Sequence, residues 1–276
     1  MPSALDKYVN IHYPSASPID LITEILLLAY RNLIASIDKV FLIWQVVFPV
    51  VYIFVAGYSY SALMGEQGVK FGDVLVTYPA YLTAGMIGFN VMNSSIVAGS
   101  IIWNDKRNGM FQQLLVMPYT KVQYIISNLL TIVLMGLASA ALIVIIGLPT
   151  MLNNVNPTIW SIPYTVYALV VGAVFFGSFT IIISTKLKSS EGFTVISNGV
   201  FLFFAFASSA FYPAAGVPEP LRTAFYINPL TYIVDISRAG IFSQVTSFTN
   251  IQLLIITIVS VGAFLMATVS MVKMKI

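Results

Sequence analysis

Residues 122–147 read VQYIISNLLTIVLMGLASAALIVIIG, and none of these side chains is charged. They begin an uncharged stretch of 64 residues between Lys121 and Lys186. A charge at the centre of a bilayer costs about 2.5–3.5 kcal/mol on insertion scales, and a helix of about 20 residues crosses the hydrocarbon core. The stretch is therefore long enough to cross a membrane twice. A polar break at residues 153–157 (NNVNP) would separate the two helices, because no lipid-exposed helix interior carries such a sequence.

Four more uncharged stretches surround this one, at residues 40–65, 74–104, 192–218 and 239–272. The whole chain is 58% hydrophobic and 8% charged, against about 25% charged residues in soluble domains. These features predict an all-α integral membrane protein whose residues 40–276 form one domain of six transmembrane helices. The expected spans are residues 40–64, 74–103, 122–147, 164–185, 192–212 and 251–272.

The basic residues predict the orientation of these spans, because loops on the cytoplasmic side carry an excess of Lys and Arg. We expect the protein in the plasma membrane, with both termini in the cytoplasm. In this orientation three basic residues lie outside the cell: Lys70, Arg222 and Arg238. The other ten lie inside: Lys7, Arg31, Lys39, Lys106, Arg107, Lys121, Lys186, Lys188, Lys273 and Lys275. The net charge of +3 is too small to indicate a nucleic-acid partner.

The cytoplasmic segment at residues 1–39 contains a helix of another kind. Ser17 precedes Pro18 and stands three residues before Asp20, as in a capping box. Asp20, Glu24, Arg31 and Asp38 fall within about 40° of one another on a helical wheel, and most other positions are apolar. We expect an amphipathic helix at the cytoplasmic membrane surface, or alternatively a helix packed on another protein.

A short amphipathic helix is also expected in the cytoplasmic connection at residues 104–118. It is charged at its start and ends at Pro118, and the spacing of Met110, Phe111 and Leu114 places them on one side. Such a helix either docks into a groove of a soluble partner or lies on lipid.

Residues 213–242 are expected to form a re-entrant segment before the last span. Pro213, Pro218 and the Asn228-Pro229 pair break the helical pattern in apolar surroundings. Broken backbone at membrane depth must be covered by protein or by a water-filled cavity. Asp235 and Arg238 are three residues apart on a helical stretch, so they could pair on one face, the alternative being an ion-coupling site.

These two loops resemble the type-2 ATP-binding-cassette (ABC) exporter permeases. The first similarity runs from Arg107 through Gly109 and Leu114-Leu115 to Pro118, with Met110 and Gln112 departing from the usual residues. The second runs from Tyr212-Pro213 through Asn228-Pro229-Leu230-Thr231-Tyr232 to Arg238, with Pro220 departing. The residues that correspond to this second signature are Pro213, Pro218, Asn228, Pro229, Tyr232, Asp235 and Arg238.

The resemblance implies a permease that pairs with a second copy or a paralogue in the lipid membrane and binds two separate ABC ATPase subunits. ATP and Mg²⁺ would be bound by those subunits and no cofactor by this chain. The implied ATPase contacts are Arg107, Asn108, Gly109, Met110, Phe111, Leu114 and Leu115, flanked by Glu24 and Arg31. A charged substitution at Phe111 or Leu114 is then expected to uncouple the complex and leave the membrane fold intact.

The resemblance also implies a substrate pathway between two protomers, along the second and fifth spans. Its candidate residues are Thr83, Asn90, Asn93, Ser94, Val97, Asn198, Phe201, Ala205, Ser208 and Tyr212. Polar side chains of this kind alternatively hold helices together, at about 0.6–2 kcal/mol per contact. The mostly uncharged set suits hydrophobic or amphipathic cargo such as drugs, lipids or lipid-linked glycans.

The rest of the sequence argues against other sources of energy and other chemistry. It contains no G-x-x-x-x-G-K-[ST] loop for a nucleotide and no cysteine, and its single histidine, His12, lies in the N-terminal segment. No ionisable residue lies deep in the first four spans, where proton or sodium coupling would need one. We therefore expect no catalytic or metal-binding residue. An ion-coupled secondary transporter is the main alternative, followed by a membrane enzyme and a purely structural membrane protein.

Overall fold

The computed structural model describes residues 18–37, 39–64, 68–116, 119–152, 158–187 and 189–274. Its first half contains α1 (Pro18–Ala35), α2 (Lys39–Val51), the π-helix η1 (Tyr52–Ala56), α3 (Gly57–Met64), β1 (Val69–Phe71), β2 (Val74–Val76), α4 (Tyr78–Ser94), α5 (Ile96–Arg107) and α6 (Met110–Val116). Its second half contains α7 (Lys121–Met151), α8 (Ser161–Lys186), α9 (Ser190–Phe206), the 3₁₀ helix η3 (Ala214–Gly216), α10 (Leu221–Ile227), α11 (Pro229–Ile241) and α12 (Ser247–Val272).

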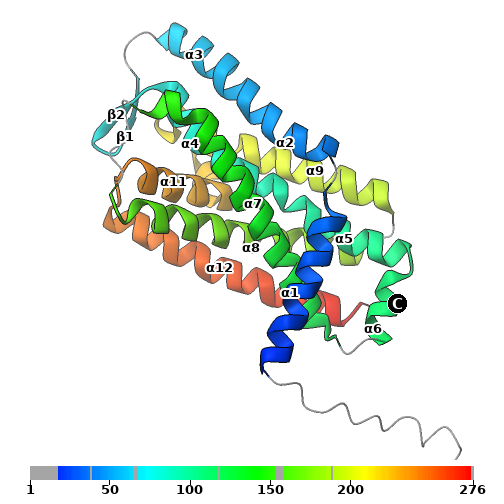
Figure 1. The fold of residues 1–276 in the computed structure, drawn as a ribbon. Helices are drawn as coiled ribbons and strands as arrows, with labels where there is room; N and C mark the ends of the chain where they lie inside the picture. Colours follow the sequence, from blue (N-terminus) through cyan, green and yellow to red (C-terminus); the bar gives the residue numbers. More distant parts are fainter. Residues whose placement is uncertain are drawn as a thin grey trace, which may run out of the picture.

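The long helices run side by side between two ends of the molecule (Figure 1). The helices α1 and α6 and the end of α12 lie at one end, and the β-hairpin and α11 lie at the other. Among the described residues, five helical segments are long and apolar enough to cross a membrane: Leu42–Leu63, Tyr78–Arg107, Lys121–Met151, Ser161–Lys186 and Ser247–Val272. The predicted class, an all-α integral membrane protein, is therefore confirmed.

The fifth predicted span, residues 192–212, differs from the others. Its helix α9 has 17 residues and ends at Phe206, so it rises only about 26 Å. Residues 207–212 form turns and bends, and two side chains described below donate hydrogen bonds to several of their backbone carbonyls. Figure 1 shows α9 beside the other long helices, beginning at the end of the bundle where α5 ends and stopping short of the β-hairpin.

A β-hairpin precedes the second span, and the sequence analysis did not anticipate it. Val69 pairs with Val76 and Phe71 pairs with Val74, with Gly72 at a φ of 60° in the two-residue turn. β-Branched residues favour strands and a glycine with positive φ favours a tight hairpin turn. The second span consequently begins at Tyr78, whereas absence of charge alone suggested residue 74.

The centre of the bundle is α4, which packs against α7, α8 and α11. Almost every side chain of α4 is buried. Its glycines permit this close packing, since a Cβ atom on Gly88 would lie only 2.7 Å from Cγ2 of Val234 on α11. The helix breaks at Ser95, where the Thr180 hydroxyl of α8 donates to the Ser95 carbonyl at 2.8 Å, and α5 continues from there.

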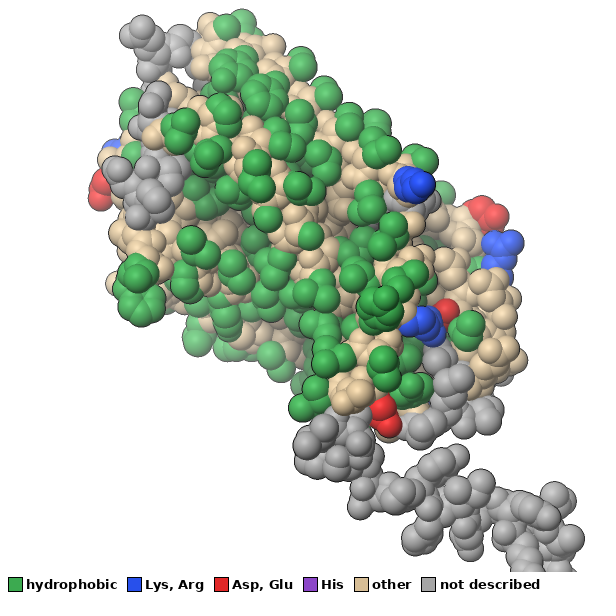
Figure 2. Space-filling view, viewed as in Figure 1, with side chains coloured by type: hydrophobic (Ala, Val, Ile, Leu, Met, Phe, Trp, Pro, Cys, Tyr) green, Lys and Arg blue, Asp and Glu red, His purple; other side chains and the backbone are tan. Residues whose placement is uncertain are grey.

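The outside of the bundle is apolar. Hydrophobic side chains cover the face shown in Figure 2, and the charged side chains lie toward the two ends. Exposed apolar residues are numerous on the first span and on α12, for example Val55, Leu63, Leu254, Ile258 and Met266. A surface of this kind is suited to contact with lipid or with another membrane helix.

The polar face of the amphipathic helix α1 is turned toward the bundle and not toward water. Glu24 and Arg31 point toward α7 and α5, where they form hydrogen bonds, and Asn32 is buried with them. The exposed face is apolar and includes Leu26 and Tyr30. The polar face is therefore used within the chain. The expected N-cap Ser17, His12, Asp38 and the polar break at 153–157 lie outside the described residues.

Candidate functional site

Two clusters bring together residues from distant parts of the sequence. The first, the α6 cluster, consists of Arg31, Asp105, Phe111 and Tyr124. The second, the Arg238 cluster, consists of Tyr81, Ser209, Ala210, Asp235 and Arg238. They lie at opposite ends of the bundle, because α6 and α11 do.

The α6 cluster begins with a reversal of the chain at Gly109. The helix α5 ends at Arg107, and the amide of Asn108 donates to the carbonyl of Asn104 at 2.9 Å. Gly109 follows with a φ of 70°, a left-handed conformation that costs other L-residues roughly 1–2 kcal/mol. This glycine lets the chain turn back into α6.

The α6 helix has a buried side and an exposed side. The ring of Phe111 is 3% exposed and packs edge-on against Tyr124 of α7, with ring centroids 5.7 Å apart. Met110 is 38% exposed. The expectation that both residues share one face is thus corrected: adjacent helix positions are about 100° apart, and the hydrophobic surface of α7 takes Phe111. Arg107, Asn108, Gln112 and Gln113 are exposed, and the side chains of Leu114 and Leu115 lie outside the described residues.

A partly buried ion pair joins α1 to the last turn of α5, just before α6. Arg31 Nη2 donates to Asp105 Oδ2, and the Tyr124 hydroxyl donates to the same oxygen at 2.7 Å. Gln123 Nε2 donates to Glu24 Oε2 at 2.7 Å. Glu24 and Arg31, expected as polar contacts for an ATPase, therefore already have partners within the chain. Asp105 and Tyr124 were not singled out from the sequence, although Asp105 stands among the charges that end the second span.

At the other end, Asn228 connects the two helices α9 and α11. The last carbonyls of a helix have no partner within it, and leaving them unsatisfied in an apolar environment is costly. Asn228 Nδ2 donates to the carbonyls of Phe204 at 2.7 Å and Ala207 at 2.6 Å. Its Oδ1 accepts from the amide of Leu230 at 2.9 Å, so it is also the N-cap of α11, with Pro229 in the first turn.

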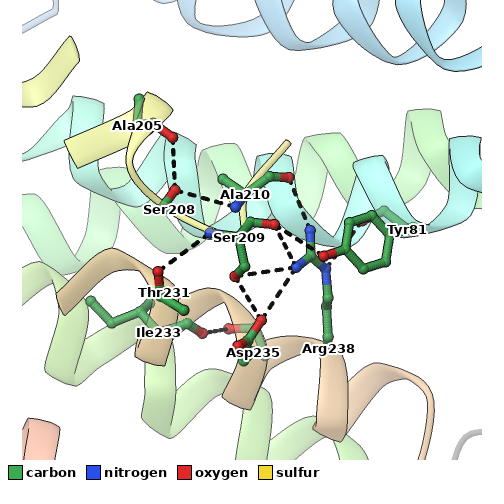
Figure 3. Close-up of polar contacts among 10 residues, drawn as sticks. Tyr81, Ala205, Ser208, Ser209, Ala210, Thr231, Ile233, Asp235 and Arg238 are labelled. Carbon is green, nitrogen blue, oxygen red and sulfur yellow. Dashed lines mark hydrogen bonds and ion pairs between the residues drawn. The ribbon is translucent and has the colours of Figure 1, made fainter. Parts of the chain in front are cut away.

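Arg238 completes this arrangement from the side of α11 (Figure 3). Its side chain has no solvent exposure. Nη1 donates to the Ser209 carbonyl at 2.8 Å, Nη2 to the Ala210 carbonyl at 2.9 Å and Nε to the Tyr81 carbonyl at 3.2 Å. The guanidinium carbon also lies 3.5 Å from the centroid of the Tyr81 ring. The planar, forked guanidinium can reach several carbonyls together, which the point charge of lysine cannot reproduce.

The charge of Arg238 is balanced by Asp235, one helical turn away. Asp235 Oδ1 lies 3.3 Å from Arg238 Nη1 and accepts a hydrogen bond from the Ser209 hydroxyl at 2.7 Å. The expected pair is thus present, and both residues also hold the turn after α9. Gly85 of α4 makes room for it, because a Cβ atom there would overlap the Ala210 carbonyl and crowd Arg238 Nη2.

The other residues of the re-entrant signature surround this cluster. Pro213 is the N-cap of η3, and Pro218 is exposed just before α10. The Tyr232 hydroxyl donates to the Tyr226 carbonyl at 2.7 Å, which joins α11 to α10. Tyr78 on α4 donates to the Phe211 carbonyl at 3.0 Å. Together with Asn228 and Tyr78, the cluster therefore satisfies the carbonyls of Phe204, Ala207, Ser209, Ala210 and Phe211.

The candidate pathway residues do not form one exposed stripe. Thr83 pairs with Thr150 of α7 at 3.0 Å, and Ser94 accepts a hydrogen bond from Gln45 of α2. Asn93 and Tyr212 are half-buried, and Asn198 is exposed. The remaining ones are buried within the protomer: Asn90, Val97, Phe201, Ala205 and Ser208. Asn90 is 1% exposed, and neither atom of its amide has a hydrogen-bond partner among the described residues.

An apolar groove of about 550 Å³ lies instead on the outward face of α9. We call it the α9 groove; its lining includes Leu202, Phe203, Tyr212, Val217 and Phe225. Of the expected pathway residues, only Tyr212 lines it. Among the described residues, no three His, Cys, Asp or Glu side chains lie close enough together to hold a metal ion.

A comparison with families of known proteins agrees with this architecture. The model of the family described as ABC-2 type transporter matches residues 23–242, from α1 to the end of α11. The matched region contains both clusters. No curated protein matches the chain. Since the family match covers most of the 276 residues and the fold is a bundle of membrane-spanning helices, the chain belongs to the ABC-2 type transporter family of membrane permeases.

Proposed function

We propose that this chain is the permease subunit of an ABC exporter that moves hydrophobic or amphipathic cargo across the plasma membrane. ATP would be hydrolysed by separate, Mg²⁺-dependent ATPase subunits. The chain itself would have no catalytic site. The observation that carries the proposal is the construction of α6, anchored on one side and exposed on the other.

The anchored side of α6 provides a route for mechanical coupling. Phe111 packs on Tyr124 of α7, and Tyr124 binds Asp105 at the end of α5 and, through it, Arg31 of α1. A displacement of α6 by a partner would therefore act on three helices together. The chain connects α5 to α4 at Ser95, and α5 packs against α8, so this connection extends toward the centre of the bundle.

The exposed side of α6 supports contact with a soluble partner. Met110 is an exposed apolar side chain beside the polar Asn108, Gln112 and Gln113. A small apolar anchor within a polar rim is a common composition for a protein interface. In this proposal Arg107, Asn108, Met110, Gln112 and Gln113 contact the ATPase, and Phe111 supports them from behind.

The distribution of charge supports a cytoplasmic location for this end of the bundle. The described basic residues near α1 and α6 and at the inner ends of α5, α8 and α12 are Arg31, Lys39, Lys106, Arg107, Lys121, Lys186 and Lys273. At the opposite end the described basic residues that reach the surface are Lys70, which is exposed, and Arg222, which is partly exposed. This asymmetry favours cytoplasmic termini.

The α9 groove supports the cargo class and a dimeric assembly. Its walls are mainly Leu, Phe, Tyr and Val side chains, and one of them, Phe206, is 51% exposed. An apolar groove on a helix face is suited to a hydrophobic group or to a second membrane helix. We infer that a second copy or a paralogue faces α9 and that cargo passes between the two protomers.

The test is purification of the tagged chain from its native membrane in mild detergent, followed by an ATPase assay of the proteins that accompany it. We expect a stoichiometric ATPase, lost in Met110→Asp. The matched control is Leu75→Asp, which places the same charge at an exposed site, 59% accessible, at the opposite end. A chain that purifies alone, and whose flux follows a proton or sodium gradient, would instead establish a secondary transporter.

A further inference from the structure

A second groove, with a volume of about 1010 Å³, lies where the last turns of α5, α8 and α12 meet. We call it the basic groove. Four cationic side chains line it, Lys106 and Arg107 from α5, Lys186 from α8 and Lys273 from α12. It is distinct from the α9 groove and from the buried side of α6.

The charge of this groove is strongly one-sided. Ten of the thirteen Lys and Arg residues are described, and four of these ten line the groove, whereas none of its described lining residues is acidic. None of the four forms an ion pair with a described carboxylate. The nearest acid in sequence, Asp105, is already bound by Arg31 and Tyr124.

Most of the donor capacity of these side chains remains available. Lys106 Nζ donates to the Ser184 carbonyl at 3.2 Å, which uses one of its three protons. Arg107, Lys186 and Lys273 are exposed. The indole nitrogen of Trp103, another lining residue, is buried and has no hydrogen-bond partner among the described residues. The groove therefore offers several donors to an anion.

Apart from Thr185 and Ser270, which hydrogen-bond to each other, the remaining walls are apolar and continue toward the lipid-facing surface. Ile182 of α8 and Leu265, Met266 and Val269 of α12 line the groove. Leu265 and Met266 are 57% and 61% exposed, as is much of the outward side of α12. A cationic head site joined to an apolar channel between helices matches the two parts of a charged lipid, whereas a soluble phosphate would use only the first.

We propose that the basic groove binds an anionic phospholipid of the surrounding membrane. The phosphate lies among Lys106, Arg107, Lys186 and Lys273. The acyl chains lie along Leu265, Met266 and Val269. The bound lipid connects the ends of α5, α8 and α12, and of its four cationic residues only Arg107 also belongs to the proposed ATPase contact.

Trp103 provides a direct measurement. The chain has three tryptophans, so Trp44→Phe/Trp160→Phe leaves Trp103 as the only indole. This variant is reconstituted in phosphatidylcholine vesicles, and its fluorescence is measured as brominated phosphatidylglycerol or brominated phosphatidylcholine replaces part of the lipid. Each cation near the membrane surface raises the affinity for an anionic lipid about fivefold. We therefore expect brominated phosphatidylglycerol to quench half of the fluorescence at a lipid fraction at least roughly tenfold lower than brominated phosphatidylcholine requires.

The control separates the groove from general surface charge. In the same background, Lys186→Gln/Lys273→Gln should abolish the preference, and Lys39→Gln/Lys70→Gln, an equal loss of charge at exposed sites elsewhere, should retain it. Equal quenching by both lipids, or an equal effect of the two double variants, would overturn the proposal. Displacement of the brominated lipid by inorganic phosphate at constant ionic strength would show that a soluble anion is the ligand, and would also overturn it. No ATPase enters the assay, so its outcome is separate from that of the proposed function.

Discussion

At the scale of single residues, Arg238 shows how the shape of one side chain matters, because its forked guanidinium binds several backbone carbonyls at once. Its guanidinium binds carbonyls from two separate segments, the Ser209-Ala210 turn and Tyr81 of α4. An unsatisfied buried acceptor costs roughly 1–3 kcal/mol. The stability of the turn after α9 should therefore depend on arginine at this position and not merely on a positive charge.

We predict that Arg238→Lys lowers stability by about 2–5 kcal/mol, or roughly 5–15 °C in apparent melting temperature, because a lysine leaves carbonyls unpaired. Thermal unfolding of the purified chain in one detergent measures this. Arg222→Lys, at a partly exposed site, is the matched control and should change little. Equal melting temperatures for the two variants would show that the forked geometry is unimportant.

Gly85 gives a second prediction at this scale. An added methyl group would overlap the Ala210 carbonyl, so Gly85→Ala should cost about 1–3 kcal/mol by overpacking. Gly262→Ala on α12 is the control, since nothing lies within 4 Å of its Cβ position, and it should be neutral or slightly stabilising. Melting curves of both variants decide the matter, and a stable Gly85→Ala variant would mean that α4 and the turn are less closely packed than described.

At the scale of elements, the position of α6 depends on the backbone of Gly109. Its φ of 70° and the empty space around its Cβ position mean that a side chain there meets only a conformational cost. Asparagine adopts this conformation most readily, alanine less and valine least. We predict that partner-dependent ATPase activity decreases in the order Gly109, Gly109→Asn, Gly109→Ala, Gly109→Val. If the activities do not follow this order, the conformation of the turn at Gly109 does not control coupling to the ATPase.

The attachment of α1 can be measured by a double-mutant cycle. Arg31→Gln and Asp105→Asn each break the pair between α1 and α5, and we expect a coupling energy of about 0.5–3 kcal/mol in thermal unfolding. Lys39→Gln with Asp105→Asn is the control pair and should be additive, because Lys39 is exposed and Asp105 already binds Arg31. Additivity in the Arg31 cycle would indicate that α1 is held by its other contacts alone.

Two sequence patterns, the absence of charge and the helical wheel, predicted different amounts of the structure because each depends on a different physical property. Absence of charge identifies spans well, because burying a charge in lipid is costly whatever the fold. It placed the start of the second span at residue 74 because Val74–Val76 is also uncharged, although these residues form a strand. The wheel of α1 identified Glu24 and Arg31 as one face but not what that face meets. Gln123 and Asp105, their partners, are separated from them by 99 and 74 residues.

The two clusters show the same limit more clearly. The sequence motif around Asn228 and Arg238 was visible, and so was their i, i+3 partner Asp235. Their acceptors were not, since Ser209, Ala210 and Tyr81 contribute backbone carbonyls, which every residue has. Phe111 was assigned to a docking face because helical spacing does not distinguish a hydrophobe that meets a partner from one that meets α7. Long-range packing decides both cases.

At the scale of the whole molecule, the lack of cysteine makes the orientation directly testable. Lys70→Cys and Gln113→Cys introduce single thiols at exposed sites at opposite ends of the bundle. We predict that a membrane-impermeant maleimide labels Lys70→Cys on intact cells, and labels Gln113→Cys only after the membrane is opened. The reverse pattern would place α6 outside the cell and contradict the proposed contact with a cytoplasmic ATPase.

The Arg238 cluster also bears on how the protein is made. Tyr81 precedes Arg238 by 157 residues, and Ser209 precedes it by 29. During synthesis, α4 is therefore complete long before the guanidinium that binds its Tyr81 carbonyl has been translated. A chain that ends before Arg238 would leave the Ser209 and Ala210 carbonyls without this donor, so a product truncated in this interval should be less stable than the full-length chain.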